Sequence, residues 1–179
     1  MNNLLTSAYG IDVAINDVQK ELYNSLVGRW NGDIEGYGRI HKNKKSGDNY
    51  LPEHYLGKGQ YKEVYYDNKL GGDFFFIVGD EDSTEDQMVF TSKVKCVFMV
   101  NLDNIYSDKE RSDVKAQKDA LEILRKYDYF GYVVTGITKT VKSIFTGFDT
   151  SKIGFTDIQP AHCFSINIDL SYYLTDKCE

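Results

Sequence analysis

Proline and cysteine are both scarce in this sequence. There are only 2 prolines, Pro52 and Pro160, in 179 residues, where average usage of ~5% would give about nine. Because proline removes a hydrogen-bond donor from a central strand, its scarcity permits unusually long strands. The 3 cysteines are an odd number without CxxC spacing. They therefore predict neither a disulfide framework nor a zinc site, and they suit a reducing compartment.

Long apolar runs and an excess of positive charge are also missing. No stretch approaches the ~18 consecutive apolar residues of a membrane-spanning helix, and the N-terminal residues lack the pattern of a signal peptide. We expect a soluble protein made in a cytoplasm, with no membrane contact. The 27 acidic residues outnumber the 21 basic ones, giving a net charge of −6. Since wrapping nucleic acid requires clustered Lys and Arg, this balance argues against that function.

The length predicts one domain spanning residues 1–179, with an N-terminal helix over residues 12–27. Residues 28–59 are polar and glycine-rich, and we interpret them as a short strand near 37–41 followed by a loop region. In the predicted helix, apolar residues recur every three or four positions; these residues are Ile11, Ile15, Val18, Leu22 and Leu26. Gly28 follows them and is expected to end the helix. The basic residues of the loop region are Arg39, Lys42, Lys44 and Lys45.

The middle of the chain predicts an antiparallel meander over residues 60–102. Its strands are expected at 60–66, at the apolar run 74–78 and at 88–102, with an acidic hairpin tip at 80–86. The last of these strands is much longer than usual.

The second half of the chain predicts two helices within residues 107–147 and a final long strand over 162–174. Ser107 and Glu110 fit a capping box that opens the first helix. The second helix is expected at 134–147, although its many β-branched residues weaken that prediction. The final strand alternates apolar and polar residues, which favours an antiparallel sheet. The predicted fold is α+β, mainly antiparallel with long strands, and helices packed on one face.

No cofactor, metal or catalytic residue is predicted, so the chain is not expected to be an enzyme. Asp80, Asp82 and Asp86 resemble the start of an EF-hand loop, but the glycine and the final glutamate of that motif are missing. His162 and Cys163 are adjacent on a strand, so their side chains point to opposite faces. An enzyme using either residue is the least favoured alternative.

Long strands and abundant tyrosine favour self-association. Strands of 13–15 residues are hard to cover within one domain of this size, so their uncovered parts are expected at a subunit interface. The 14 tyrosines fit either interface material or an A+T-rich codon bias, and both readings stay open. The expected interface residues are Tyr65, Lys93, Lys95, Val97, Met99, Tyr172 and Tyr173. The basic residues Arg39, Lys42, Lys44 and Lys45 either contact a partner or DNA or form an ordinary soluble loop.

Two segments resemble a known family. They are FTSKVKCVFMVNLDNIY (90–106), with Arg111 and Asp113 in the following helix, and FTDIQPAHCF (155–164) before the last strand. Together they resemble the tail terminator or neck ring proteins of tailed bacteriophages. The resemblance implies a tail-terminator-like fold and a non-catalytic virion protein, made in the host cytoplasm. It further implies a homo-oligomeric ring with six-fold or twelve-fold symmetry. This ring would contact portal, connector and tail proteins, and it would touch the transiting DNA non-specifically.

An alternative from a different class is a small monomeric ligand-binding domain. Its pocket would be lined by the aromatic residues Tyr61, Tyr65 and Phe75. Light scattering separates this alternative from a ring.

Overall fold

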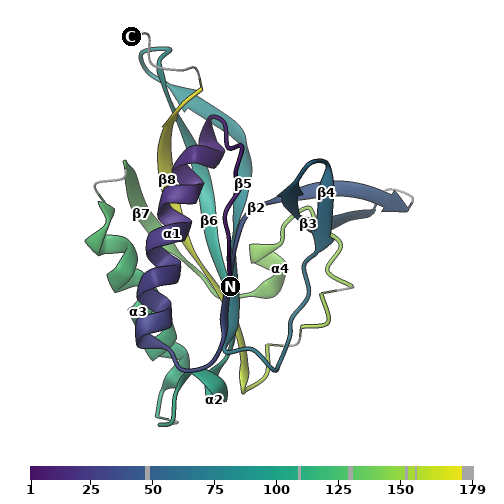
Figure 1. The fold of residues 1–179 in the computed structure, drawn as a ribbon, viewed down its shortest axis with the longest axis vertical. Helices are drawn as coiled ribbons and strands as arrows, with labels where there is room; N and C mark the ends of the chain where they lie inside the picture. The colour runs from purple at the N-terminus through teal and green to yellow at the C-terminus, as the bar shows by residue number, and fades with distance from the viewer. Residues whose placement is uncertain (47–48, 109, 129–130, 152, 156, 175–179) are drawn as a thin grey trace.

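The structure is a computed structural model that describes residues 1–46, 49–108, 110–128, 131–151, 153–155 and 157–174. Residues 44–46 and 49 are described by their backbone only. These parts form an α+β fold around one mixed, mostly antiparallel sheet in the order β4-β3-β2-β5-β6-β8-β7, with β1 added beside β2 (Figure 1). The predicted α+β class with a mainly antiparallel sheet is thus confirmed, although β2 runs parallel to both β1 and β5. The strands are β1 (Asn2–Asn3), β2 (Ile34–Ser46), β3 (Asn49–Gly57), β4 (Gln60–Glu63), β5 (Gly72–Thr84), β6 (Val89–Asn101), β7 (Tyr132–Thr138) and β8 (Ala161–Tyr173).

Four helices accompany the sheet in the described ranges. They are α1 (Ile11–Arg29), α2 (Leu102–Ile105), α3 (Ser112–Lys126) and α4 (Val141–Ile144). The predicted helix 12–27 is confirmed as α1, because its apolar stripe from Ile11 to Leu26 is buried against the sheet. The long strands expected at 88–102 and 162–174 are confirmed as β6 and β8, which pair along their whole lengths.

Each face of the sheet carries its own hydrophobic core. The first core lies under α1 and α3 and includes Phe74, Phe98 and Phe164 from three neighbouring strands. The second core lies on the opposite face, where Phe75, Val97 and Met99 meet residues of α4 and the segment after it. The prediction that helices pack on one face is therefore wrong for α4 (Figure 1). Central strands alternate between two buried faces, which explains the continuous apolar runs in the sequence.

The strand predicted near 37–41 is confirmed as part of β2, but the interpretation of the rest of 28–59 as a loop region is wrong. This region contains the long strand β2 and the strand β3, which pair antiparallel as a hairpin, and β4 pairs with β3. The expected meander over 60–102 is also wrong in its first step, because β4 does not pair with β5. Together β3, β4 and the distal half of β2 form an arm that projects sideways from the body of the molecule (Figure 1). The strands of the arm could not be predicted, because its polar, glycine-rich sequence shows little alternation of apolar and polar residues.

The helix predicted at 134–147 is wrong as well. Residues Tyr132–Thr138 form the edge strand β7, and only the four residues Val141–Ile144 are helical. The β-branched residues Val133, Val134 and Thr135 suit a strand better than a helix. The apolar residues of 134–148 are spaced by three and four positions only because the strand β7 is followed closely by the short helix α4.

The capping box predicted at Ser107 and Glu110 does not open a helix. Residues 102–105 form α2, and α3 begins at Ser112 after Arg111 in the left-handed region (φ 51°). The Oδ1 of Asp108 accepts the backbone N–H of Glu110 at 2.8 Å, and Glu110 and Arg111 lie in a turn. The predicted helix therefore starts five residues later than expected.

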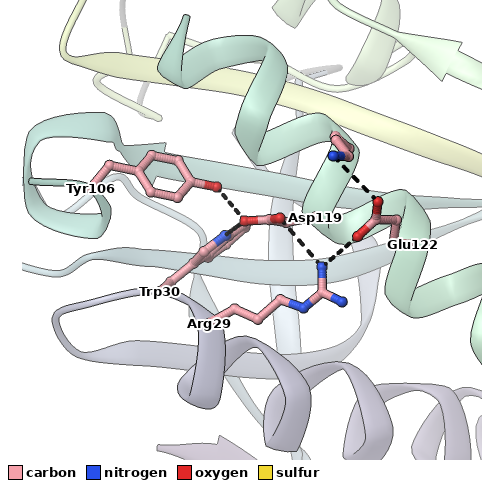
Figure 2. Close-up of polar contacts among 6 residues, drawn as sticks. Arg29, Trp30, Tyr106, Asp119 and Glu122 are labelled. Carbon is pink, nitrogen blue, oxygen red and sulfur yellow. Dashed lines mark hydrogen bonds and ion pairs between the residues drawn. The ribbon is translucent and has the colours of Figure 1, made fainter. Parts of the chain in front are cut away.

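One carboxylate in the middle of α3 joins the C-terminal ends of α1 and α2 (Figure 2). The Oδ2 of Asp119 on α3 accepts hydrogen bonds from Trp30 Nε1 (3.1 Å) and from the Tyr106 hydroxyl (2.6 Å). Arg29 donates to both Asp119 (3.3 Å) and Glu122 (2.9 Å). Burial, followed by the hydrogen bond to Asp119, raises the pKa of Tyr106. These contacts hold the C-terminal end of α1 against α3.

Candidate functional site

Exposed apolar side chains gather at the two opposite ends of the sheet. β7 is the last strand of the order, and among the described residues one of its edges has no strand partner. It exposes Val133 (67%) and Ile137 (37%). At the other end, the arm exposes large side chains on β3, on β4 and just after β4; these are Tyr50, Leu56, Tyr61 and Tyr65. The two ends differ in shape and composition.

The hairpin between β5 and β6 extends beyond the helices. Residues 80–88 are exposed, although β5 remains paired with β6 up to Thr84. Figure 1 shows this hairpin with the end of β8 reaching past α1 toward the C-terminus. The acidic tip expected at 80–86 is therefore partly strand. In the part of the chain that the structure describes, the tips of these long strands are exposed, as their length suggested.

The expected interface residues fall into three environments. Val97 and Met99 are fully buried in the second core, so in this fold they are not available to a neighbouring subunit. Lys95 lies on the same face, and its Nζ donates to the carbonyl oxygens of Ser143 (2.7 Å) and Ile144 (3.0 Å). Burial lowers the pKa of Lys95.

Of the remaining expected interface residues, three are exposed and one, Tyr172, is buried. Lys93 is exposed and lines a groove of about 500 Å³ on the second face of the sheet. Tyr65 and Tyr173 are exposed. Tyr172 is buried, and its hydroxyl donates to Asp82 at 2.8 Å. Burial, together with that hydrogen bond, raises the pKa of Tyr172 to about 12.

The basic residues expected in a loop lie on strand β2. Arg39 forms an ion pair with Asp12 of α1 at 3.0 Å, and Lys42 forms one with Asp80 at 3.0 Å. Both cations are therefore engaged within the chain. The side chains of the other two, Lys44 and Lys45, lie outside the described residues.

The three aromatic residues expected in one pocket lie in three places. Phe75 is buried in the second core. Tyr61 packs beside Tyr55, with 5.1 Å between ring centroids. Tyr65 lines a polar cavity at the base of the arm. The structure thus does not bring them together.

That polar cavity is the most unusual group of titratable side chains in the described chain. The Tyr37 hydroxyl donates to the carboxylate of Glu35, and Lys62 Nζ donates to the Tyr37 hydroxyl at 2.9 Å. His54 stacks on the Tyr37 ring, with 3.9 Å between centroids. Burial is the main cause that raises the pKa of Asp73 to about 8. Burial also lowers the pKa of His54 to about 3, with the charge of Lys62 as a smaller cause.

Sequence reasoning missed this cavity. Its residues come from β2, β3, β4 and β5 and the connection between the last two, and no motif links them. The one available signal was Asp73, a single carboxylate directly before the apolar run 74–78. A charged residue at the start of a buried strand indicates an unusual environment.

His162 and Cys163 lie on opposite faces, as their positions on a strand predicted. The His162 Nε2 is 3.0 Å from Gln117 Nε2, and its Nδ1 is 3.2 Å from Asp157 Oδ1. Cys163 is buried in the second core, and burial raises the pKa of its thiol well above the ordinary value. A thiol in that state is a poor nucleophile.

Neither a metal centre nor a membrane span emerges from the described residues. No group of three or more His, Cys, Asp or Glu side chains among them is arranged to hold a metal ion. Within the same ranges, no helix is both long and apolar enough to cross a membrane. Asp82 and Asp86 have separate partners, the Tyr172 hydroxyl and the backbone N–H groups of Met88 and Val89. Comparison with known proteins adds no relative: no protein-family model matches the chain, and no curated protein matches it significantly.

Proposed function

We propose that this chain is a structural subunit that assembles with copies of itself into a closed ring. The resemblance of residues 90–113 and 155–174 to tail terminator and neck proteins gives the ring its place. It would lie at the head–tail joint, or cap the tail tube, of a tailed bacteriophage. Its neighbours would be portal, connector and tail proteins. The subunit would be made in the host cytoplasm, remain in the virion, have a tail-terminator-like fold and catalyse no reaction.

The observation that carries the proposal is the pair of different apolar ends of the sheet. A closed ring requires head-to-tail contacts, in which one surface of each subunit meets a different surface of the next. Val133 and Ile137 provide one exposed apolar surface, and the arm residues Tyr50, Leu56 and Tyr61 provide another. Because these surfaces occupy opposite ends of one sheet, contact between them would repeat around a ring. An uncovered edge strand is also prone to pair with another chain.

Two further features favour a structural subunit over a monomeric protein. The hairpin 80–88 extends beyond the helices and is available to a neighbour above or below the ring. The net charge of −6 suits a channel through which DNA slides without binding tightly.

The first test is the oligomeric state of the purified chain. Size-exclusion chromatography with light scattering and negative-stain imaging should show ring-shaped particles at high protein concentration. A phage ring can require its connector as a template, so the measurement is repeated with a portal or connector protein from the genome that encodes this chain. A monomer under both conditions would overturn the proposal.

A second test asks whether the contacts are head-to-tail. Val133→Glu disables one end and Tyr61→Glu disables the other, and each variant alone should be monomeric. Mixed together, the two variants should form heterodimers and nothing larger, since each keeps one intact end. Val13→Glu, at an exposed apolar position on α1, is the matched control and should assemble like the wild type. If either variant still forms rings, or if the mixture stays monomeric, the head-to-tail arrangement is wrong.

A further inference from the structure

A small polar cavity lies at the base of the arm, where the arm meets the second face of the sheet. It has a volume of about 110 Å³, which exceeds the space of a single water. It is lined by residues of four strands and of the connection between β4 and β5; these are Glu35, Tyr37, His54, Lys62, Glu63, Tyr65, Asp67, Leu70 and Asp73. None of these residues is among those proposed above for the ring contacts.

One side chain of the cavity has an unused polar atom. His54 is 2% exposed, and its Nδ1 has no hydrogen-bond partner among the described residues. Its ring is held between Tyr37 (3.9 Å between centroids) and Phe75 (5.3 Å). Leaving a buried polar atom without a partner costs about 1–3 kcal/mol, so such an atom indicates a missing ligand or water.

The charges around the cavity are unbalanced. Among the described residues, four carboxylic acids line it, and Lys62 is the only Lys or Arg that does so. The Lys62 Nζ sits 5.3 Å from the centroid of the Tyr37 ring and 5.5 Å from that of Tyr65. The ammonium group of Lys62 is therefore already held by cation–π contacts with the two tyrosine rings, and a second cation would use the same kind of contact.

We propose that this cavity binds a small organic cation, of the primary ammonium or guanidinium class. Its N–H groups would donate to the carboxylates of Glu35 and Asp73 and to the free nitrogen of His54. The apolar part of the ligand would lie against the rings of Tyr37 and Tyr65. Such a group comes either from a free small molecule or from the tip of a Lys or Arg side chain of another protein, a second copy included.

The protonation of Asp73 gives the site a pH dependence. Burial raises the pKa of Asp73 to about 8, with Glu35 and Asp67 raising it further and Lys62 lowering it. At pH 7 the acid is therefore mostly protonated, and a bound cation would favour its ionised form. Binding should release a proton at pH 7, and affinity should rise as the pH increases from 7 to 9.

The binding test uses matched charged and neutral probes. Methylguanidinium and ethylammonium are titrated into the full chain, with methylurea and ethanol as neutral probes of similar shape. The NMR signals of the His54 ring, one of 3 histidines, provide the readout. They are assigned with a His54→Gln variant. The cations should shift these signals saturably and the neutral probes should not. No saturable shift, or an equal shift with the neutral probes, would overturn the proposal and leave a water-filled cavity.

Variants of opposite expected effect separate binding from loss of folding. Asp73→Asn should weaken methylguanidinium binding about tenfold, because one charge-assisted hydrogen bond is lost. Lys62→Gln should strengthen it, since the resident cation is removed, and a merely unfolded variant would not bind more tightly. Asp17→Asn, an exposed acid on α1, should leave binding unchanged. Weaker binding of Lys62→Gln would contradict a cation site.

The source of the cation is found from the oligomeric state. If the cavity receives a side chain of a second copy, saturating methylguanidinium should dissociate the assembled chain. If the ligand is a free molecule, the oligomeric state should not change while the His54 signals still shift. Failure of ring formation does not affect the binding measurement, so the two proposals fail separately.

Discussion

The imidazole of His54 lies flat on the phenol ring of Tyr37, with 3.9 Å between centroids and 14° between the ring planes. Phe75 closes the other side of the imidazole edge-on, at 5.3 Å. The stack excludes water from His54 and so disfavours its charged form. His54 and the buried acid Asp73 line the same cavity, and the altered pKa of each makes the stability of the fold depend on pH.

Stability should form a plateau in mildly acidic solution and fall above it. The pKa of His54 is lowered from 6.5 to about 3, so its contribution to stability is lost as the pH falls from 6.5 to 3. The pKa of Asp73 is raised from 3.8 to about 8, so its contribution is lost as the pH rises from 3.8 to 8. Between about pH 4 and 6.5 the two slopes oppose each other, each about 1.4 kcal/mol per pH unit. From 6.5 to 8 only the loss from Asp73 remains.

Asp73→Asn tests this profile by difference. The variant should gain stability relative to the wild type as the pH rises from about 4 to 8. Urea unfolding at half-unit pH intervals provides the free energies. The groups that influence Asp73 are Glu35 on β2, Lys62 on β4 and Asp67 after β4. A difference that does not change with pH would contradict the raised pKa.

Asp119→Asn should destabilise the fold by about 1–3 kcal/mol. The Asp119 Oδ2 accepts from both Trp30 and Tyr106, and an amide nitrogen at that position could accept from neither. Glu122→Gln is the matched control, because it removes a more exposed ion pair with the same Arg29 and should destabilise the fold much less than Asp119→Asn. Urea unfolding measures both. Equal effects of the two variants would show that the Trp30 and Tyr106 hydrogen bonds add little.

Lys95→Met should loosen the short helix α4 without unfolding the sheet. The substitution keeps an apolar stem but leaves the carbonyl groups of Ser143 and Ile144 without their ammonium donor. Hydrogen exchange of residues 141–148 should become faster, while that of β6 and β8 stays slow. Lys93→Met changes an exposed lysine on the same face of the same strand and should have no such effect. Unchanged exchange at 141–148 in Lys95→Met would contradict this role.

Cys96 and Cys163 should not react with a thiol reagent in the folded state. Both are buried, and burial raises the pKa of each thiol. In a Cys178→Ser variant, reaction with Ellman's reagent should follow global unfolding in urea, because only then do the thiols become ionised and accessible. Rapid reaction without urea would place one of them on the surface.

Patterns of neighbouring residues correctly predicted the helices and strands in which the buried residues follow one regular spacing. The stripe from Ile11 to Leu26 predicted α1, because a helix packed on a sheet buries one face. Alternation along residues 162–174 and the continuous run near Val97 predicted β8 and β6. The same reasoning failed for β7, where a short strand and a four-residue helix together imitated helical spacing.

The sequence alone therefore determined the class of the fold and its long central strands, which depend on residues close together in the chain. The scarcity of proline and the acidic net charge are properties of the sequence itself. Only the tertiary structure decided that β2 lies parallel to β5 and that β3 and β4 pair with β2 as a sideways arm. That arrangement brings Glu35, His54, Lys62 and Asp73 to one cavity, although they come from four strands. Burial at that meeting point, which no local pattern encodes, gives His54 and Asp73 their altered acidity.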